Sequence, residues 1–224
     1  MNRWIRLLSI LALAGLSACH SKATSPANSP ASVDIARISP MGAARQLAMQ
    51  HKSRAYDVMA RGIVPDQRDS FVSFIRSVDE VLAANESLRL LTETRYSAPA
   101  VEAMSLSPMA DNLGLFSQTV TFFSEDYLGG KAYVTLQEGE QVPLVHAEFE
   151  FRDGRWLFRP AGVPPSAAGE MSRLASMLIE LRRGVEAGLT VDRFAEAFEL
   201  RVPPQIRRIA ALQEVKIAGA AVEP

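Results

Sequence analysis

Three polar residues with chemically useful side chains alternate along one short stretch: His146, Glu148 and Glu150 in LVHAEFEF. An imidazole and two carboxylates are groups that transfer protons or bind a metal ion. On an extended strand, alternate side chains share a face and stand about 6.6–6.8 Å apart. The row could therefore place an acid and a base across a substrate, or bind an ion together with ligands from elsewhere. The same alternation is typical of the solvated face of a half-buried sheet, which is the interpretation we favour. The sequence predicts neither a metal site nor a cofactor.

Other polar groups give weaker signals. His51 lies in a strongly polar run, which predicts an exposed helical position. Glu125-Asp126 precedes Gly129-Gly130 without EF-hand spacing, so a polar turn between strands is expected. The Arg182-Arg183 and Arg207-Arg208 pairs have glutamates nearby, which predicts ordinary surface charge.

No known reaction signature is present. The sequence lacks G-x-S-x-G, H-E-x-x-H, C-x-x-C and a glycine-rich phosphate loop. Among the aromatic residues, Tyr133, Trp156 and Phe158 are expected in a core, with the lining of a cavity as the alternative. We therefore predict a protein that is not an enzyme and has no catalytic residues.

The only cysteine, Cys19, follows Arg3, Arg6 and the apolar residues 7–16. Positive charge, a short apolar run and small residues are typical of a secretory signal, and this run is too short to span a bilayer. The segment Leu16-Ser17-Ala18-Cys19 resembles the lipobox of bacterial lipoproteins. The resemblance implies a signal peptide over residues 1–18, cleavage before Cys19, and acyl chains on the cysteine sulfur and the new amine. An ordinary signal peptide and an uncleaved anchor are the alternatives.

Residues 19–40 are mostly Ser, Ala, Pro, Thr and Asn, a composition that predicts a disordered lipidated tether. Its root-mean-square reach is on the order of 25 Å. In lipoproteins of bacteria with two membranes, a residue other than aspartate directly after the lipidated cysteine indicates the outer membrane. Here that residue is His20, so the resemblance implies an anchor in the outer membrane and a folded chain that faces the periplasm. The expected partners are therefore the membrane, through the lipid anchor, and an envelope protein, polymer or small ligand. A formal net charge of −1 argues against nucleic acid.

An α+β domain is predicted over residues 41–165, and its helices and strands would position the polar row. A helix is expected over residues 40–61, and a second one after Asp66, where apolar residues recur at three- and four-residue steps. Three or four antiparallel strands should follow. The predicted strands are residues 116–123, residues 131–137, and a hairpin over residues 144–160 that turns at Asp153-Gly154.

A C-terminal helical extension is predicted over residues 166–216. It should contain one helix around Met171 to Val185, a short helix capped by Thr190, and a third helix opened by Pro203-Pro204. Residues 217–224 are expected to be a flexible tail. Residues 97–114 contain prolines and no sustained period, which indicates an irregular segment.

The order of helices, strands and a charged hairpin resembles the α+β cone fold of the nuclear transport factor two-like family. The likeness rests on residues 131–137, residues 144–151, the turn Arg152-Asp153-Gly154-Arg155 and Trp156. It departs from that family in having fewer expected strands and a long helical extension. The resemblance implies a second possible function, a small-molecule enzyme or ligand binder that uses a cone-fold pocket with Glu148, Glu150 and His146.

Overall fold

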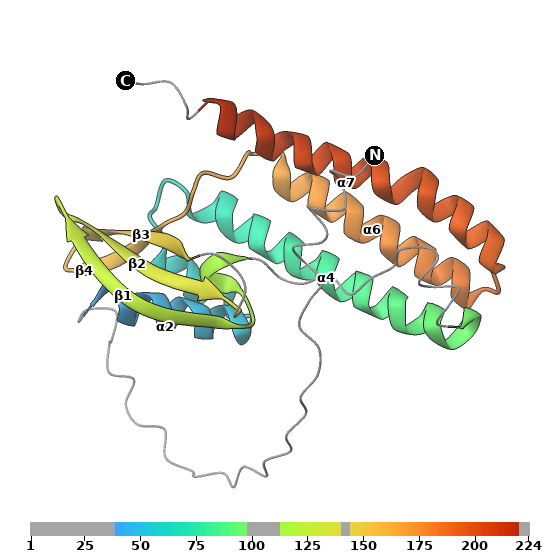
Figure 1. The fold of residues 1–224 in the computed structure, drawn as a ribbon, viewed down its shortest axis with the longest axis horizontal. Coiled ribbons are helices and arrows are strands. Elements are labelled where there is room, and N and C mark those ends of the chain that lie inside the picture. The colour runs from blue at the N-terminus through green and yellow to red at the C-terminus, as the bar shows by residue number, and fades with distance from the viewer. Residues whose placement is uncertain (1–38, 98–112, 140–143, 220–224) are drawn as a thin grey trace, which may run out of the picture. The chain divides into compact units, whose positions relative to one another are not determined.

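The computed structural model describes residues 39–97, 113–139 and 144–219. The predicted signal peptide, Cys19 and almost all of the tether lie outside these residues, as do most of the irregular segment and the end of the tail. The described chain has helices before and after one four-stranded antiparallel sheet, so the predicted α+β class is confirmed (Figure 1). None of the described helices is long and apolar enough to cross a membrane.

The chain divides into two compact units. The first unit, called here the sheet unit, combines the residues up to Asp66 with Asp111–Pro160. The second, the helical unit, combines Gln67–Ala110 with Ala161–Pro224. This division differs from the predicted boundary at residue 165, because the helix after Asp66 is grouped with the C-terminal helices and not with the sheet.

The sheet unit begins with helix α2 (Pro40–Lys52). One hydroxyl oxygen and one carboxylate oxygen accept hydrogen bonds from backbone N–H groups in its first turn. Ser39 Oγ accepts from the Gly42 N–H (3.0 Å), and Glu125 Oε2 accepts from the Met41 N–H (2.8 Å). The negative charge of Glu125 is also favourable at a helix N-terminus. Strand β1 thereby holds the start of α2.

Helix α2 ends earlier than predicted. Arg54 has a positive φ of 54°, its N–H donates to the carbonyl of His51 (2.7 Å), and the next N–H donates to that of Gln50 (2.8 Å). This left-handed closure is common after helices, although glycine usually provides it. The expected single helix over residues 40–61 is therefore wrong. The chain instead continues through the short helices α3 (Tyr56–Met59) and η2 (Ala60–Gly62).

The sheet is a meander in the order β1-β2-β3-β4, with all neighbours antiparallel. Its strands are β1 (Val120–Leu128), β2 (Lys131–Glu138), β3 (Val145–Arg152) and β4 (Arg155–Arg159). Asp153 and Gly154 both have positive φ, at 52° and 76°, as the predicted two-residue hairpin turn requires.

Strand β1 corrects two expectations. It begins at Val120 rather than at residue 116, because Gly114–Phe116 form a short 3-10 helix, η3. It also runs through Glu125-Asp126, so the predicted polar turn at these two residues is wrong. The turn is formed by Gly129 and Gly130, whose φ values of 56° and 83° suit glycine far better than an acidic residue.

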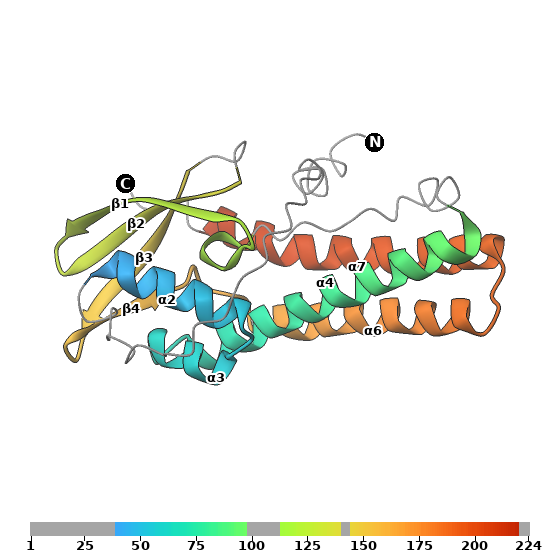
Figure 2. The ribbon, with the colours of Figure 1, turned by 90° about the horizontal axis from the view of Figure 1, so that it is seen from below.

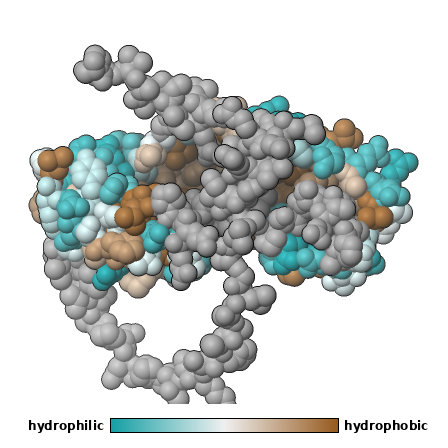
Figure 3. Space-filling view, viewed as in Figure 1, coloured by the Kyte–Doolittle hydropathy of each residue, from teal (hydrophilic) through white to brown (hydrophobic). Residues whose placement is uncertain are grey.

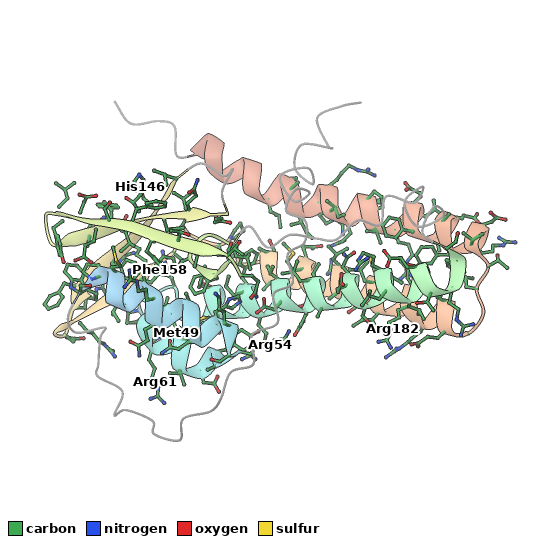
Figure 4. The ribbon with its side chains drawn as sticks, turned by 60° about the horizontal axis from the view of Figure 1, so that its bottom comes forward. Met49, Arg54, Arg61, His146, Phe158 and Arg182 are labelled. Atoms are coloured by element: carbon green, nitrogen blue, oxygen red, sulfur yellow. The ribbon has the colours of Figure 1, made fainter. Side chains whose placement is uncertain are left out.

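The core of the sheet unit lies between α2 and one face of the sheet, where Figure 4 shows Phe158. Phe158 contacts Phe149 and Phe116, with ring centroids 5.6 Å apart in both pairs. His51 is only 2% exposed and meets Phe116 edge-on at 5.5 Å, so the prediction of an exposed His51 is wrong. The helical period explains the error, because His51 shares the buried stripe of α2 with Ala44 and Ala48.

The helical unit contains α4 (Arg68–Tyr96), α6 (Ala167–Glu186) and α7 (Val191–Gly219), which lie side by side (Figure 2). Their apolar stripes meet in one core. Its large members are Val81, Leu88, Leu174, Leu178, Leu181, Phe194 and Phe198. The periodicity of α4 and α6 is therefore confirmed as the signal of packed helices.

The predicted helix break at Pro203-Pro204 is absent, because α7 runs through both prolines. Prolines in this position remove the N–H groups that would bond to the carbonyls of Glu199 and Leu200. The neighbouring residues compensate: Val202 and Ile209 are buried on either side, and the Gln205 amide donates to the carbonyl oxygen (2.9 Å) and the carboxylate (2.7 Å) of Glu170.

Candidate functional site

The predicted polar row lies on β3 with its three side chains on one face. Thr135, Tyr133 and Lys131 of β2 are the direct partners of His146, Glu148 and Glu150, in that order. Figure 4 shows His146 on the side of the sheet away from α2. It is exposed, and its Nδ1 lies 3.1 Å from Thr135 Oγ1.

Both carboxylates of the row belong to a network of ion pairs. Lys131 Nζ lies 2.8 Å from Glu148 Oε1. Arg159 Nε donates to Glu150 Oε2 (3.0 Å), and Arg152 also pairs with Glu150. Three cations and three carboxylates form this network, called here the charged ladder: Lys131, Arg152, Arg159, Asp66, Glu148 and Glu150. Its formal charge is zero.

The electrostatics of Glu150 oppose an acid–base role. Hydrogen bonds from Arg152 and Arg159 lower the pKa of Glu150, because both guanidinium groups favour the ionised carboxylate. The same contact with Glu150 raises the pKa of Arg159. A general acid at neutral pH needs a carboxyl pKa that is raised, not lowered. Among the described residues, no group of three or more His, Cys, Asp or Glu side chains is placed to hold a metal.

A pocket of about 430 Å³ opens elsewhere in the sheet unit, between α2, the α3–η2 segment and the β3–β4 hairpin. Its volume falls in the range of small-molecule sites. The lining residues are Ala43, Gln46, Leu47, Gln50, Val58, Arg61, Gly62, Asp153, Arg155, Trp156 and Leu157. None of the residues of the predicted polar row is among them.

Local sequence explains how the pocket forms. Gln46 and Gln50 are one helical turn apart on α2, so they line the same wall. Gly62 permits η2 to approach that helix, since a Cβ atom there would lie 2.8 Å from Leu47 Cδ2. The tight turn at Asp153-Gly154 then brings the start of β4 to the opposite wall.

Trp156 is held in place by two other aromatic rings. Its ring centroid lies 5.0 Å from that of Phe151 and 5.7 Å from that of Tyr127. Phe151 and Tyr127 are themselves 50% and 58% exposed, so this aromatic group lies at the surface and not in the core. Of the three residues expected as core or cavity aromatics, Trp156 thus lines a pocket and Phe158 is buried. Tyr133 is in neither place, because it is half-buried opposite Glu148 on the polar face of the sheet. The visible surface of this unit is otherwise mostly hydrophilic, with small separate hydrophobic patches (Figure 3).

The polar side chains of the pocket lack partners within the described part of the chain. Arg61 and Arg155 form no ion pair there, and Gln46, Gln50 and the Trp156 indole make no side-chain hydrogen bond. Figure 4 shows Arg61 extending from the edge of the unit, which makes it a rim residue. The pocket is therefore rich in hydrogen-bond donors that nothing in the described fold uses.

Sequence reasoning missed four of these five residues, because each is an ordinary surface residue on its own. Only the one-turn spacing of Gln46 and Gln50 and the position of Arg155 beside a predicted turn could have suggested a shared site. Arg61 reaches it through the unpredicted end of α2. No protein-family model, curated protein or solved structure matches this chain.

Proposed function

We propose that this chain is a lipid-anchored protein of the cell envelope, not an enzyme, whose sheet unit binds a small ligand in the pocket. The lipobox-like Leu16-Ser17-Ala18-Cys19 supports the anchor, and the Ser/Ala/Pro-rich residues that follow support a tether. On this proposal the anchor lies in the outer membrane and the folded units face the periplasm. The tether would let the sheet unit reach ligands near the bilayer.

The observation that carries the binding role is the set of unpartnered polar side chains around one hollow. Small-molecule sites are hollows in which a few polar side chains converge on an otherwise largely apolar lining. Gln46, Gln50, Arg155 and the indole of Trp156 come from two separate segments and line one pocket. A ligand in this pocket would provide the acceptors that the described fold does not.

The alternative of a small-molecule enzyme gains less support. It assigned catalysis to Glu148, Glu150 and His146, which lie outside the pocket, and both carboxylates are held in the charged ladder. The carboxylate that lines the pocket is Asp153, which is exposed in the hairpin turn. A general base needs closer placement against a substrate than an exposed turn provides.

Substitution of Cys19 tests the anchor. The C19A chain should lose incorporation of an alkyne-labelled fatty acid and leave the membrane fraction, because the acyl chains are its main attachment. The matched control, Ser21→Ala, should label and fractionate like the wild type. Equal labelling of the C19A chain would contradict lipidation at this residue.

Ligand retention tests the pocket. The full chain should retain a small molecule from an envelope extract, and Q46A/Q50A should retain at least several-fold less of it, since two amides are lost. The control E148Q/E150Q changes two polar residues of the charged ladder and should retain the ligand fully. Equal retention by Q46A/Q50A and the wild type would place binding elsewhere.

A further inference from the structure

We propose that the pocket recognises an oxyanion group, a phosphate or carboxylate on a small ligand, with Arg61 and Arg155 as its charged contacts. This inference rests on the proposed function, because it names the chemistry of the ligand for that same pocket. It assigns Gln46 and Gln50 as neutral donors and Trp156 as the surface for the rest of the ligand.

The hydrogen-bonding inventory of the pocket points to a ligand made of acceptors. A guanidinium group has five N–H donors and no acceptor, the indole has one donor, and each amide side chain has two N–H donors and one acceptor oxygen. Asp153 adds acceptor oxygens, but the donors of the lining outnumber its acceptors. Phosphate and carboxylate groups present several acceptor oxygens and no donor when ionised, and arginine binds both in a bidentate manner. The donor-rich lining therefore matches an ionised oxygen group better than a neutral polyol.

The charge of the lining points the same way. The pocket lining contains two arginines and one carboxylate, Asp153, so its formal charge is +1. Within the described residues, Asp153 pairs with neither Arg61 nor Arg155. An exposed arginine without an ion-pair partner costs the fold little free energy, so a single one would not indicate a binding site. Here two arginines from different segments border the same hollow.

The chemistry of the rest of the ligand follows from the apolar lining. Trp156 presents a partly exposed ring fixed by Phe151 and Tyr127, and Val58, 45% exposed, adds an aliphatic side chain. A rigid aromatic side chain offers contact area at low cost in conformational entropy. A ligand with a short carbon skeleton beside its oxyanion should therefore bind better than inorganic phosphate alone.

Trp156 provides a direct reporter for the test. The chain has two tryptophans, Trp4 and Trp156. The lipidated chain would lose Trp4 with the proposed signal peptide, and in the unprocessed chain W4F leaves emission from Trp156 alone. We expect glycerol phosphate to change Trp156 emission of the full chain saturably, and glycerol, its neutral counterpart, to have no effect. Inorganic phosphate should act in the same direction at higher concentration.

Two charge variants define the contacts. R61Q/R155Q should weaken binding of glycerol phosphate on the order of a hundredfold, at about tenfold for each lost charged hydrogen bond. R182Q/R193Q removes the same charge from α6 and α7, where both arginines pair with glutamates, and should bind as the wild type does. Thermal unfolding of both variants should match that of the wild type, since all four side chains are exposed.

A second experiment, with vesicles, distinguishes a lipid headgroup from a soluble ligand as the source of the oxyanion. With the lipidated chain in vesicles, a change of Trp156 emission that requires phosphatidylglycerol, and is absent with phosphatidylcholine alone, identifies an anionic lipid headgroup. A change that requires soluble glycerol phosphate in both vesicles identifies a soluble ligand. Either result supports recognition of an oxyanion by the pocket.

Two results would overturn the inference in different ways. If glycerol or a neutral disaccharide acts as glycerol phosphate does, or if R61Q/R155Q binds normally, the oxyanion assignment fails while the pocket remains a ligand site. If no charged or neutral probe changes Trp156 emission, both this inference and the proposed binding role fail.

Discussion

The charged ladder and the pocket belong to the same sheet unit, yet their polar groups are in opposite states. In the ladder, Glu148 and Glu150 are paired with lysine and arginine at short distances. In the pocket, Arg155 and Gln50 have no side-chain partner in the described part of the chain. The comparison shows that residue type alone is a poor guide to a site. What matters is whether the fold already satisfies the residue.

The two regions differ because their backbones differ. Directly opposed residues on neighbouring antiparallel strands have Cβ atoms about 4.5–5.5 Å apart, so charged residues on one face satisfy one another. Glu148 is opposite Arg159, and Glu150 is opposite Lys131. The closest contacts run diagonally between these pairs, from Arg159 to Glu150 (3.0 Å) and from Lys131 to Glu148 (2.8 Å), because long side chains reach diagonal neighbours on the same face. The pocket residues come from a helix, a 3-10 turn and a hairpin, which are brought together around a hollow without such regular spacing. Unpaired groups can therefore remain there.

The largest expected effect concerns the residue between the two ladder carboxylates. Phe149 is fully buried on the opposite face of β3, and F149A should lower the free energy of unfolding of the sheet unit by about 3–5 kcal/mol. Trp156 emission during urea unfolding measures it. F151A is the control, because Phe151 is half exposed and should cost far less. Equal losses would contradict the assigned core.

A smaller effect should separate the ladder from the pocket. Arg159 contacts Glu150, Glu148 and Asp66, so R159A should lower the free energy of unfolding by about 1 kcal/mol. R155A removes an arginine without an ion-pair partner in the described chain, and its effect should stay within about 0.5 kcal/mol. A larger loss of unfolding free energy for R155A than for R159A in urea unfolding would contradict the difference between the ladder and the pocket.

The smallest effect is a dependence on pH. The lowered pKa of Glu150 in the folded chain means that its stabilisation is complete above its unfolded-state pKa of about 4.3 and is lost as pH falls through the folded-state value. The difference in stability between the wild type and E150Q should therefore be constant from pH 5 to pH 7 and shrink below about pH 4. Urea unfolding of both chains across this range measures the difference. A difference that grows on acidification would contradict the assignment.

Features governed by short-range pattern were predictable from sequence. The stripe of α4, the alternation of β2 and β3, and the positive-φ turn at Asp153-Gly154 follow from local periodicity and turn chemistry. The burial of His51 was not, because it depends on which face of α2 the sheet covers. The continuity of α7 through Pro203-Pro204 depends likewise on packing around Val202 and Gln205.

The polar row could be predicted as a face but not as a network. Alternation places His146, Glu148 and Glu150 together, whereas the register with β2 and β4 decides that Lys131 and Arg159 meet the carboxylates. The pocket was beyond local sequence entirely. Its walls meet only because a left-handed Arg54 ends α2 early and returns the chain past the hairpin.

The indole N–H resonance of Trp156 can show whether an oxyanion binds in the pocket and not at the charged ladder. In nuclear magnetic resonance spectra of the full W4F chain, glycerol phosphate should shift this resonance saturably, with or without E148Q/E150Q. In R61Q/R155Q the same shift should need a glycerol phosphate concentration on the order of a hundredfold higher. An equal shift at the same concentration in R61Q/R155Q, or loss of the shift in E148Q/E150Q, would contradict an oxyanion site in the pocket.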